Sequence, residues 1–350
     1  MPRGDALAEL ATGCSNDLAH RGPDGAGYWQ NNPKNPTAML VHRRLAVLDP
    51  TPRSDQPYRG RFDGRRLALA YNGEIFNFRE LRGGLDRRWK TDGDTEVLLA
   101  AYAARGEACV EDFEGMFAFA VVDESEKGQP KLVLARDPAG EKPLFVAVAK
   151  HGGRVGGVAF ASELTCLRRM IARLRWPGIE LRPGMHALQD YLAWGYVPGA
   201  DTIHVGISKL LPGHTLTVTR EGATRQRYFD AGGVYELGEP DRWAGAVTLT
   251  RQLVGAAVRR RLISDVPIGC LLSGGIDSSV VALHMAEALQ REGRTLQTFS
   301  IGFDDPRYDE SPHAAEVAKH LGARHHAFTV RPEEIDVTGD LPKLARVLGE

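Results

Sequence analysis

Residues 266–279 read Val266-Pro267-Ile268-Gly269-Cys270-Leu271-Leu272-Ser273-Gly274-Gly275-Ile276-Asp277-Ser278-Ser279. The apolar first half predicts a buried strand, the glycines predict a tight turn, and the apolar spacing over 280–289 predicts a helix. Glycine lets the backbone approach an anion, and the hydroxyls and free N–H groups of the first helical turn can then bind it. The stretch therefore predicts an anion-binding loop. Taken alone, its Ser-Gly-Gly triplet is also typical of an ordinary glycine-rich turn.

The residues around this loop predict an open parallel sheet. Strands and helices that alternate along a chain form parallel sheets with crossover helices, and ligands bind at the carboxyl ends of such strands. The loop has no lysine in the G-x-x-x-x-G-K-[ST] arrangement, so it is not of the type that holds a transferable γ-phosphate. The predicted elements are helices over 243–262, 279–291 and 311–321 and strands over 296–303 and 324–329.

The first two thirds of the chain have a different character. Up to about residue 228 short strands predominate, which predicts an α+β domain of layered antiparallel sheets. We place the boundary near residue 238, giving domains 1–238 and 239–350. The predicted elements are helices over 6–19 and 95–105 and strands over 37–42, 45–49, 67–72, 117–123, 131–137, 144–149, 158–161 and 216–219.

Composition excludes several classes of protein. A formal net charge of −1 gives no polyelectrolyte signal, so we expect no nucleic-acid partner. No run of about 18 apolar residues exists, so no membrane span is expected, and the polar start of the chain favours a cytoplasmic location. The cysteines show no C-x-x-C pairing, so they predict core residues rather than a zinc site or a disulfide framework. They are Cys14, Cys109, Cys166 and Cys270.

Several motifs of the first domain together resemble the glutaminase domain of class II glutamine amidotransferases, which are N-terminal-nucleophile hydrolases. The resemblance implies a fold of layered antiparallel sheets and a glutamine substrate. The motifs are His20-Arg21-Gly22-Pro23-Asp24, His42-Arg43-Arg44-Leu45, Asn72-Gly73-Glu74-Ile75-Phe76-Asn77, Gly93-Asp94-Thr95-Glu96, Gly115-Met116-Phe117-Ala118-Phe119-Ala120, the run from Arg136 to Leu144, and Phe160-Ala161-Ser162-Glu163.

The resemblance assigns glutamine-binding roles to five residues. Arginine suits the α-carboxylate of glutamine and aspartate suits its ammonium, and these roles fall to Arg44 and Asp94. Asn72 and the N–H of Gly73 would form the oxyanion hole, and Glu74 would add substrate contacts. For Asn72–Glu74 alone, a hairpin turn is the competing interpretation.

The nucleophile of this class is a cysteine at the mature N-terminus, whose own α-amino group is the base. Here residue 2 is proline, and Cys14 lies inside the predicted first helix, so we reject it as the nucleophile. The cysteine strand that precedes this helix in the family is missing from the sequence. Either the domain has lost its hydrolase, as in β-lactam synthetase-like relatives, or the chain starts late, which the retained glutamine-binding residues favour. We expect no glutamine hydrolysis by the usual route.

The second domain resembles the ATP-pyrophosphatase synthetase domain of asparagine synthetase. Residues 259–262 and 264–279 carry this resemblance, and residues 190–198 and 207–214, before the boundary, fit the connector of that family. Leu272 and Ile301 would pack on or hydrogen-bond the adenine, and Asp277 would help to hold Mg²⁺. Residues 309–311 would lie near the nucleotide or simply cap a helix. The implied ATP-binding residues are Leu272, Ser273, Gly274, Gly275, Asp277, Ser278, Ser279 and Ile301.

The resemblance implies a complete reaction for the parent enzyme. Ammonia from glutamine would attack an aspartyl-adenylate, made from aspartate and ATP, to give asparagine, AMP and pyrophosphate; a homodimer is a further expectation. A second glycine-acidic loop of the family is not found, so we expect the domain to be incomplete at its C-terminal end, to expose an apolar edge, and not to complete the ATP-dependent reaction alone. The alternatives are a β-lactam synthetase-like or specialised-metabolite amide ligase, and a non-catalytic fragment that binds nucleotide or glutamine.

Overall fold

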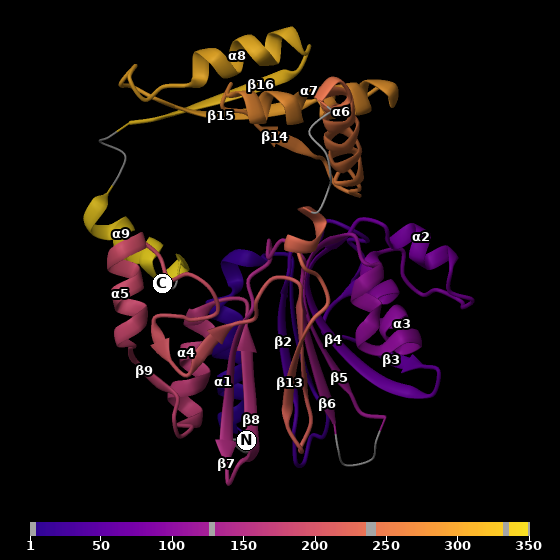
Figure 1. Ribbon diagram of the computed structural model, residues 1–350, viewed down its shortest axis with the longest axis vertical. Coiled ribbons are helices and arrows are strands. Elements are labelled where there is room, and N and C mark those ends of the chain that lie inside the picture. Colours follow the sequence, from indigo (N-terminus) through magenta and orange to yellow (C-terminus); the bar gives the residue numbers. More distant parts are fainter. Residues whose placement is uncertain (1–4, 126–129, 236–242, 332–335, 349–350) are drawn as a thin grey trace. The chain divides into compact units, whose positions relative to one another are not determined.

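The computed structural model describes residues 5–125, 130–235, 243–331 and 336–348 (Figure 1). Its tertiary contacts divide the chain into two compact units, each described by itself below. Unit 1 is Met1–Glu236 with Ala345–Glu350, and unit 2 is Leu237–Leu344. The boundary predicted at residue 238 falls outside the described residues.

A six-stranded antiparallel sheet forms the centre of unit 1. The even-numbered residues of its strand β5, such as Ala118 and Ala120, face a second layer of strands, whereas Phe117 and Phe119 face the opposite side. There Phe113 packs edge-on against Phe117 with ring centroids 5.7 Å apart. The strands, in spatial order, are β13 (Ala223–Arg227), β12 (His214–Val218), β6 (Lys131–Arg136), β5 (Gly115–Asp123), β4 (Arg65–Ile75) and β3 (Tyr58–Phe62).

The second layer of unit 1 contains two separate antiparallel groups of strands. One is the pair β1 (Gly25–Gln30) and β2 (Met39–Arg44); the other is β11 (Ile207–Lys209), β7 (Phe145–His151) and β8 (Arg154–Ala161). Both groups share one apolar core with the six-stranded sheet and a second apolar core with the helices above them. The described residues of this unit also form a short ribbon of β9 (Glu180–Pro183) and β10 (His204–Val205).

Helices cover both outer faces of these two sheet layers. Helices α1 (Asp5–Asp17) and α4 (Leu164–Leu174) pack on each other, α1 on β2 and α4 on β8. Helix α3 (Asp94–Arg105) packs on β3 and β4 and on the short α2 (Phe78–Gly83), on the other side of the molecule (Figure 1). Unit 1 is therefore a helix–sheet–sheet–helix sandwich. Its remaining helices are α5 (Met185–Trp194) and the 3₁₀ turns Ala19–Arg21, Pro52–Ser54, Gly106–Asp112 and Gly232–Tyr235.

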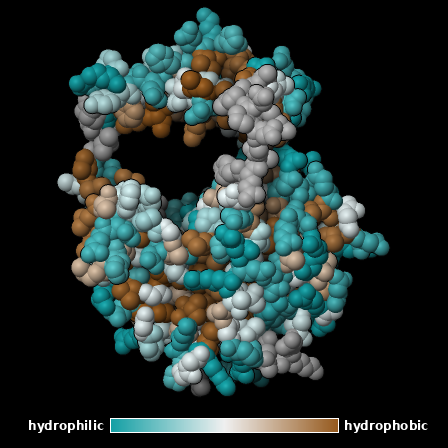
Figure 2. All heavy atoms as spheres, viewed as in Figure 1, coloured by the Kyte–Doolittle hydropathy of each residue, from teal (hydrophilic) through white to brown (hydrophobic). Residues whose placement is uncertain are grey.

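Unit 2 contains a parallel sheet in the order β14 (Gly269–Leu271), β15 (Gln297–Phe303) and β16 (Arg324–Val330). Its helices are α6 (Trp243–Arg260), α7 (Ile276–Arg291), α8 (Ser311–His320) and, partly, α9 (Val337–Leu348). Figure 1 draws α7 and α8 on one side of the strands. On the other side, large apolar side chains are exposed, and Figure 2 shows this strand side as hydrophobic. They include Leu271, Ile301, Phe303 and Phe328.

The structure confirms the predicted fold class, with antiparallel layers first and a parallel sheet afterwards. The four cysteines are buried and unbridged, as expected of core residues. Among the described residues, no helix is both long and apolar enough to cross a membrane. The sequence did not predict α2, α4 or α5, so unit 1 is richer in helix than expected.

The strand predicted over 45–49 is wrong. The guanidinium of Arg44 takes the carbonyl oxygens of Leu48, Asp49 and Thr51 as hydrogen-bond acceptors, so these groups cannot join a strand ladder. Asp49 also has a φ of 42°, in the left-handed region, which turns the chain. The segment therefore wraps around an arginine side chain.

We expect Gly27→Ala to destabilise unit 1. A Cβ at this position of β1 would overlap the backbone carbonyl of Gln56, which cannot move away as a flexible side chain could. The free energy of unfolding should fall by about 1–3 kcal/mol, the usual range for overpacking, as measured by urea denaturation. Gly83→Ala, in α2 with nothing nearby to meet the new Cβ, is the control and should be at least as stable as the unaltered chain, because alanine favours a helix more than glycine does.

Candidate active sites

A cavity of about 630 Å³ lies inside unit 1, between the two sheet layers and α1. All five residues that the sequence assigned to glutamine binding line it, and they come from three elements. One end of the cavity is polar and the other is lined by apolar residues of α1, α4, β2, β5 and β8. The five residues are Arg44 of β2, Asn72, Gly73 and Glu74 of β4, and Asp94 of α3.

The polar end is built where β4 and β5 approach each other closely. A Cβ at Gly73 would overlap the carbonyl oxygen of Met116, and one at Gly115 would overlap that of Glu74. Gly73 also has a φ of 151°, which L side chains rarely adopt. Next to it, the Nδ2 of Asn72 is buried and has no hydrogen-bond partner among the described residues. A buried donor without a partner is costly, so Asn72 offers an amide N–H₂ to an acceptor in the cavity.

Asp94 opens α3 at the wall of this cavity and is only 4% exposed. Its Oδ2 accepts hydrogen bonds from the Tyr71 hydroxyl (2.7 Å) and the Ile75 N–H (3.0 Å). Burial raises the pKa of Asp94, although these hydrogen bonds act in the opposite direction. The carboxylate is therefore fixed against β4 by two donors.

Glu74 is a second acid at the same end. Burial and the neighbouring Asp94 raise the pKa of its carboxyl to about 7, and the Lys142 ammonium partly offsets this. The cavity thus holds two carboxyl groups close together, and Glu74 is partly protonated at neutral pH.

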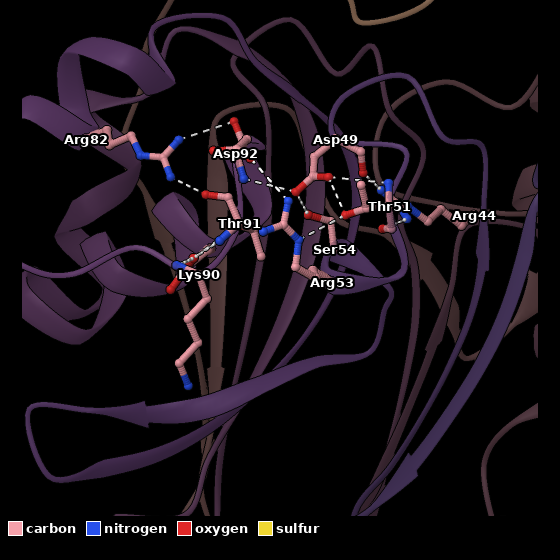
Figure 3. Close-up of polar contacts among 10 residues, drawn as sticks. Arg44, Asp49, Thr51, Arg53, Ser54, Arg82, Lys90, Thr91 and Asp92 are labelled. Carbon is pink, nitrogen blue, oxygen red and sulfur yellow. Dashed lines mark hydrogen bonds and ion pairs between the residues drawn. The ribbon is translucent and has the colours of Figure 1, made fainter.

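Arg44 is buried, and both of its Nη atoms hold the following loop. Beyond the three carbonyl oxygens already described, its Nη1 donates to Asp55 Oδ1 at 2.9 Å. The side chain therefore borders the cavity, but its Nη groups donate hydrogen bonds to other residues of the protein. Figure 3 shows the side chain pointing into the loop.

The same loop is tied to the segment before α3 by Asp49. Its Oδ2 accepts from the Ser54 hydroxyl (2.7 Å) and from the Asp92 N–H (2.9 Å), and its Oδ1 accepts from the Thr51 hydroxyl (2.6 Å) (Figure 3). Burial alone would raise the pKa of Asp49, but these hydrogen bonds lower it to about 2. Asp49 thereby fixes the position at which α3 and Asp94 begin.

In unit 2, the glycine loop lies between the carboxyl end of β14 and the first turn of α7. Gly274 has a φ of 85°, and a Cβ there would lie 2.7 Å from the Ala314 nitrogen of α8. The Ser273 and Ser278 hydroxyls are 3.0 Å apart, and the Ser279 hydroxyl donates to the Gly275 carbonyl at 2.7 Å. The loop is thus a hydroxyl-lined turn at a helix N-terminus, the geometry that suits phosphate oxygens.

Comparisons with known proteins match two family models to this chain. Residues 3–229 match the glutamine amidotransferase domain family, and residues 249–350 match the asparagine synthase family. The chain belongs to the asparagine synthetase family.

Several relatives are named asparagine synthetase [glutamine-hydrolyzing]. The chain is 32% identical to asparagine synthetase [glutamine-hydrolyzing] 3 of Bacillus subtilis, with 95% of this chain and 54% of that protein covered. It is 32% identical to a putative asparagine synthetase of Mycobacterium tuberculosis, with 100% of this chain and 52% of that protein covered. It is 30% identical to a putative asparagine synthetase of Methanocaldococcus jannaschii, with 95% of this chain and 64% of that protein covered. The chain spans about half the length of the first two relatives.

Within this family framework, three cavity residues had no role in the sequence prediction. Tyr71 holds Asp94, Lys142 partly offsets the raised pKa of Glu74, and His42 donates through Nε2 to the Tyr71 carbonyl at 3.0 Å. Burial lowers the pKa of His42 to about 4, so its ring is neutral. His42 and Lys142 stood inside the motifs, and Tyr71 directly precedes one, but no spacing rule gave them a function. Cys14, rejected as the nucleophile, lies buried inside α1.

The residues that the sequence analysis assigned to nucleotide binding are brought together only in part. Leu272 is 2% exposed and its N–H donates to the Phe299 carbonyl, so its side chain cannot cover an adenine and only its carbonyl remains. Ile301 is 58% exposed and Leu271 is 79% exposed, so these two side chains form the apolar surface beside the loop. Asp309 Oδ1 accepts the Ser311 N–H at 3.0 Å, which fits the simple helix-start interpretation of 309–311.

Replacing Asp49 should destabilise unit 1 in a pH-dependent way. Because the pKa of Asp49 is lowered from 3.8 to about 2, its stabilisation is present above pH 4 and is lost as the pH falls toward 2. Asp49→Ala should therefore lower the free energy of unfolding by about 1–3 kcal/mol at pH 7, and the difference should shrink at pH 3. Urea denaturation at both pH values measures it, with Asp92→Asn, whose side chain is exposed, as the control.

Glu74→Gln should have the opposite effect on stability: it should raise the free energy of unfolding of unit 1 at high pH. A carboxyl whose pKa is raised from 4.5 to about 7 stabilises the fold below pH 4.5 and loses this contribution as the pH rises through 7. The glutamine variant cannot ionise, so it should be more stable than the unaltered chain at pH 8 and equal to it at pH 4. Thermal unfolding at the two pH values tests this; equal melting temperatures at pH 8 would contradict it.

Proposed function

We propose that this chain carries the glutamine site and the nucleotide loop of a glutamine-dependent asparagine synthetase. In the whole reaction, glutamine and water give glutamate and ammonia, while an aspartate carboxylate attacks the α-phosphorus of ATP and releases pyrophosphate. Ammonia then displaces AMP from the aspartyl-adenylate and leaves asparagine. The names of the relatives and the matches of both domain families support this assignment.

The glutamine half of the proposal is supported by one observation: the buried Nδ2 of Asn72, beside Gly73, has no hydrogen-bond partner in the part of the chain that the structure describes. We assign Asn72 Nδ2 and the Gly73 N–H to the oxyanion that develops on the substrate amide. Asp94 would hold the substrate ammonium, Glu74 would add a polar contact, and Arg44 would attract the carboxylate by its charge while it anchors the 45–55 loop.

The nucleotide half is supported by the hydroxyl-lined turn at the start of α7. Ser273, Ser278 and Ser279, with the backbone of Gly274 and Gly275, would hold the departing pyrophosphate. Asp277 is an exposed carboxylate in the first turn of α7, a hard oxygen ligand of the kind that Mg²⁺ accepts together with phosphate oxygens. Among the described residues, no group of three His, Cys, Asp or Glu forms a metal cluster, which fits an ion held mainly by the nucleotide. Ile301 would meet the adenine ring, and Leu272 would offer its carbonyl.

Titrating the chain with ATP and Mg²⁺ in a calorimeter tests the loop assignment. Gly274→Val should weaken binding at least tenfold, because its side chain would enter the backbone of α8 and displace the loop. Lys319→Gln, at the far end of α8, is the matched control and should bind like the unaltered chain. Equal affinity for ATP in the unaltered chain and both variants would contradict the assignment of the loop to the nucleotide site.

Glutamine binding tests the other half. Asn72→Leu keeps the volume of the side chain but removes its amide, so the affinity for glutamine should fall at least tenfold in the same assay. Asn77→Leu is unsuitable as a control because its amide bonds Asp112 and Glu114. Gln30→Leu, at the end of β1, is the better choice. Unchanged binding by Asn72→Leu would refute the oxyanion-hole assignment.

A further inference from the structure

Helices α1 and α4 of unit 1 cross each other at a close contact. The two helices pack together (Figure 1), and a Cβ at Gly13 of α1 would lie 2.8 Å from Arg169 Cδ of α4. Asp17 of α1 accepts two hydrogen bonds from the Arg169 guanidinium, at 2.6 and 2.7 Å. His20, which follows α1, bonds the N-cap residue of α4, Glu163, at 2.8 Å. These contacts fix which residues of the two helices face each other.

Cys14 and Cys166 meet at this crossing. Cys14 directly follows Gly13 in α1, and Cys166 lies one turn before Arg169 in α4. Both side chains belong to the same apolar core and are 2% and 3% exposed, respectively. Their thiols hydrogen-bond to each other. Two cysteines that are far apart in the sequence therefore have their sulfur atoms in contact.

The geometry of a helix crossing suits a disulfide. The axes of packed helices lie about 8–10 Å apart, and each Cα lies about 2.3 Å from its own axis. Facing Cα atoms at a crossing are therefore roughly 4–6 Å apart, and a disulfide requires a separation of about 4.4–6.8 Å. A bridge between Cys14 and Cys166 thus needs no large movement of either helix.

The two thiols are chemically unequal. The hydrogen bond with the Cys166 thiol lowers the pKa of Cys14, although burial acts in the opposite direction. The same hydrogen bond and burial raise the pKa of Cys166. The charged groups that face Cys14 are Asp17, which raises its pKa, and Arg169, which lowers it. Because the thiolate is the nucleophile of sulfur chemistry, Cys14 is the reactive member of the pair.

We propose that Cys14 and Cys166 are a site of reversible oxidation, at which hydrogen peroxide produces a disulfide that ties α1 to α4. The Cys14 thiolate attacks one peroxide oxygen, so that an S–O bond forms, the O–O bond breaks and the other oxygen leaves as water after it takes up a proton. The Cys166 sulfur then attacks the Cys14 sulfur, so that the S–S bond forms, the S–O bond breaks and a second water leaves with the Cys166 proton. Two thiols are oxidised, and one hydrogen peroxide is reduced to two waters.

The disulfide would make the stability of unit 1 depend on its oxidation state. Helix α1 packs on β2 and α4 packs on β8, so the bridge joins the helices that cover both strands. It would also close a loop that contains most of unit 1, which reduces the conformational entropy of the unfolded chain. The proposal depends only on the crossing of α1 and α4 and is independent of glutamine or nucleotide binding.

Peptide mapping by mass spectrometry without a reducing agent tests the proposal on the whole chain. After treatment with a small excess of hydrogen peroxide at neutral pH, we expect one disulfide, between Cys14 and Cys166, and dithiothreitol should remove it. Cys109 and Cys270 are the internal controls and should stay reduced, because burial raises the pKa of each and they lie in different units.

Three outcomes of the mapping would overturn the proposal. They are the absence of any disulfide, a disulfide in another pairing, and a disulfide between two copies of the chain. The same oxidation in concentrated urea is the control for the helix crossing, because the unfolded chain has no reason to favour this pair. Equally fast and selective pairing of Cys14 with Cys166 in urea would also contradict the proposal.

Single variants separate the roles of the two cysteines. Cys166→Ala should stop the reaction at the sulfenic acid of Cys14, so labelling of Cys14 by dimedone should rise at least tenfold over the unaltered chain. Cys14→Ala should give neither the disulfide nor the dimedone adduct. Cys109→Ala removes another buried thiol of unit 1 and, as the matched control, should form the disulfide like the unaltered chain. Equal dimedone labelling of Cys14→Ala and Cys166→Ala would refute the assigned roles.

Thermal unfolding measures the effect of the bridge without any substitution. The oxidised chain should melt about 5 °C or more above the reduced chain, and dithiothreitol should abolish the difference. Cys14→Ala should show no such difference between peroxide-treated and untreated samples. Equal melting temperatures of the bridged and reduced chains, with the bridge verified by mapping, would contradict a disulfide that constrains α1 and α4.

Discussion

The close approach of β4 and β5 at Gly73 and Gly115 is the constraint on which unit 1 depends. Each glycine lies against a carbonyl oxygen of the opposite strand, so neither position has room for a Cβ. The contact fixes the register in which Asn72 and Glu74 flank the cavity. It also sets the position of Ile75, whose N–H holds the carboxylate of Asp94. The absence of a side chain at both glycines thereby determines the positions of Asn72, Glu74 and Asp94.

The polar end of the cavity is electrostatically poised for a cation. Burial and the nearby Asp94 raise the cost of ionising Glu74, and Lys142 offsets this only in part. A bound ammonium group would relieve the repulsion, because an opposite charge nearby favours the ionised form of both acids. The protonation state of the two carboxyl groups therefore depends on whether an ammonium group is bound.

Much of this architecture could be predicted from the sequence. The alternating pattern around residues 266–330 predicted the parallel sheet because each strand and helix there is locally consistent. The 45–49 segment was misread because apolar spacing cannot reveal that Arg44 would capture its carbonyls. The five residues assigned to glutamine binding do line one cavity, but the sequence did not indicate that Arg44 spends most of its donors on its own loop. Likewise, which of Leu271 and Leu272 faces outward depends on strand register, and this is fixed only by pairing with β15.

The contact between Gly274 and α8 has a mechanical consequence. The turn that starts α7 rests directly on the backbone at His313 and Ala314, so the loop cannot shift inward unless α8 slides. Helix α8 in turn packs on β15 and β16. A ligand that restricts the motion of the loop would therefore also restrict the motion of α8 and of β15 and β16, on which α8 packs. Unit 2 would then respond to a small ligand as one body rather than through a local change in its turn.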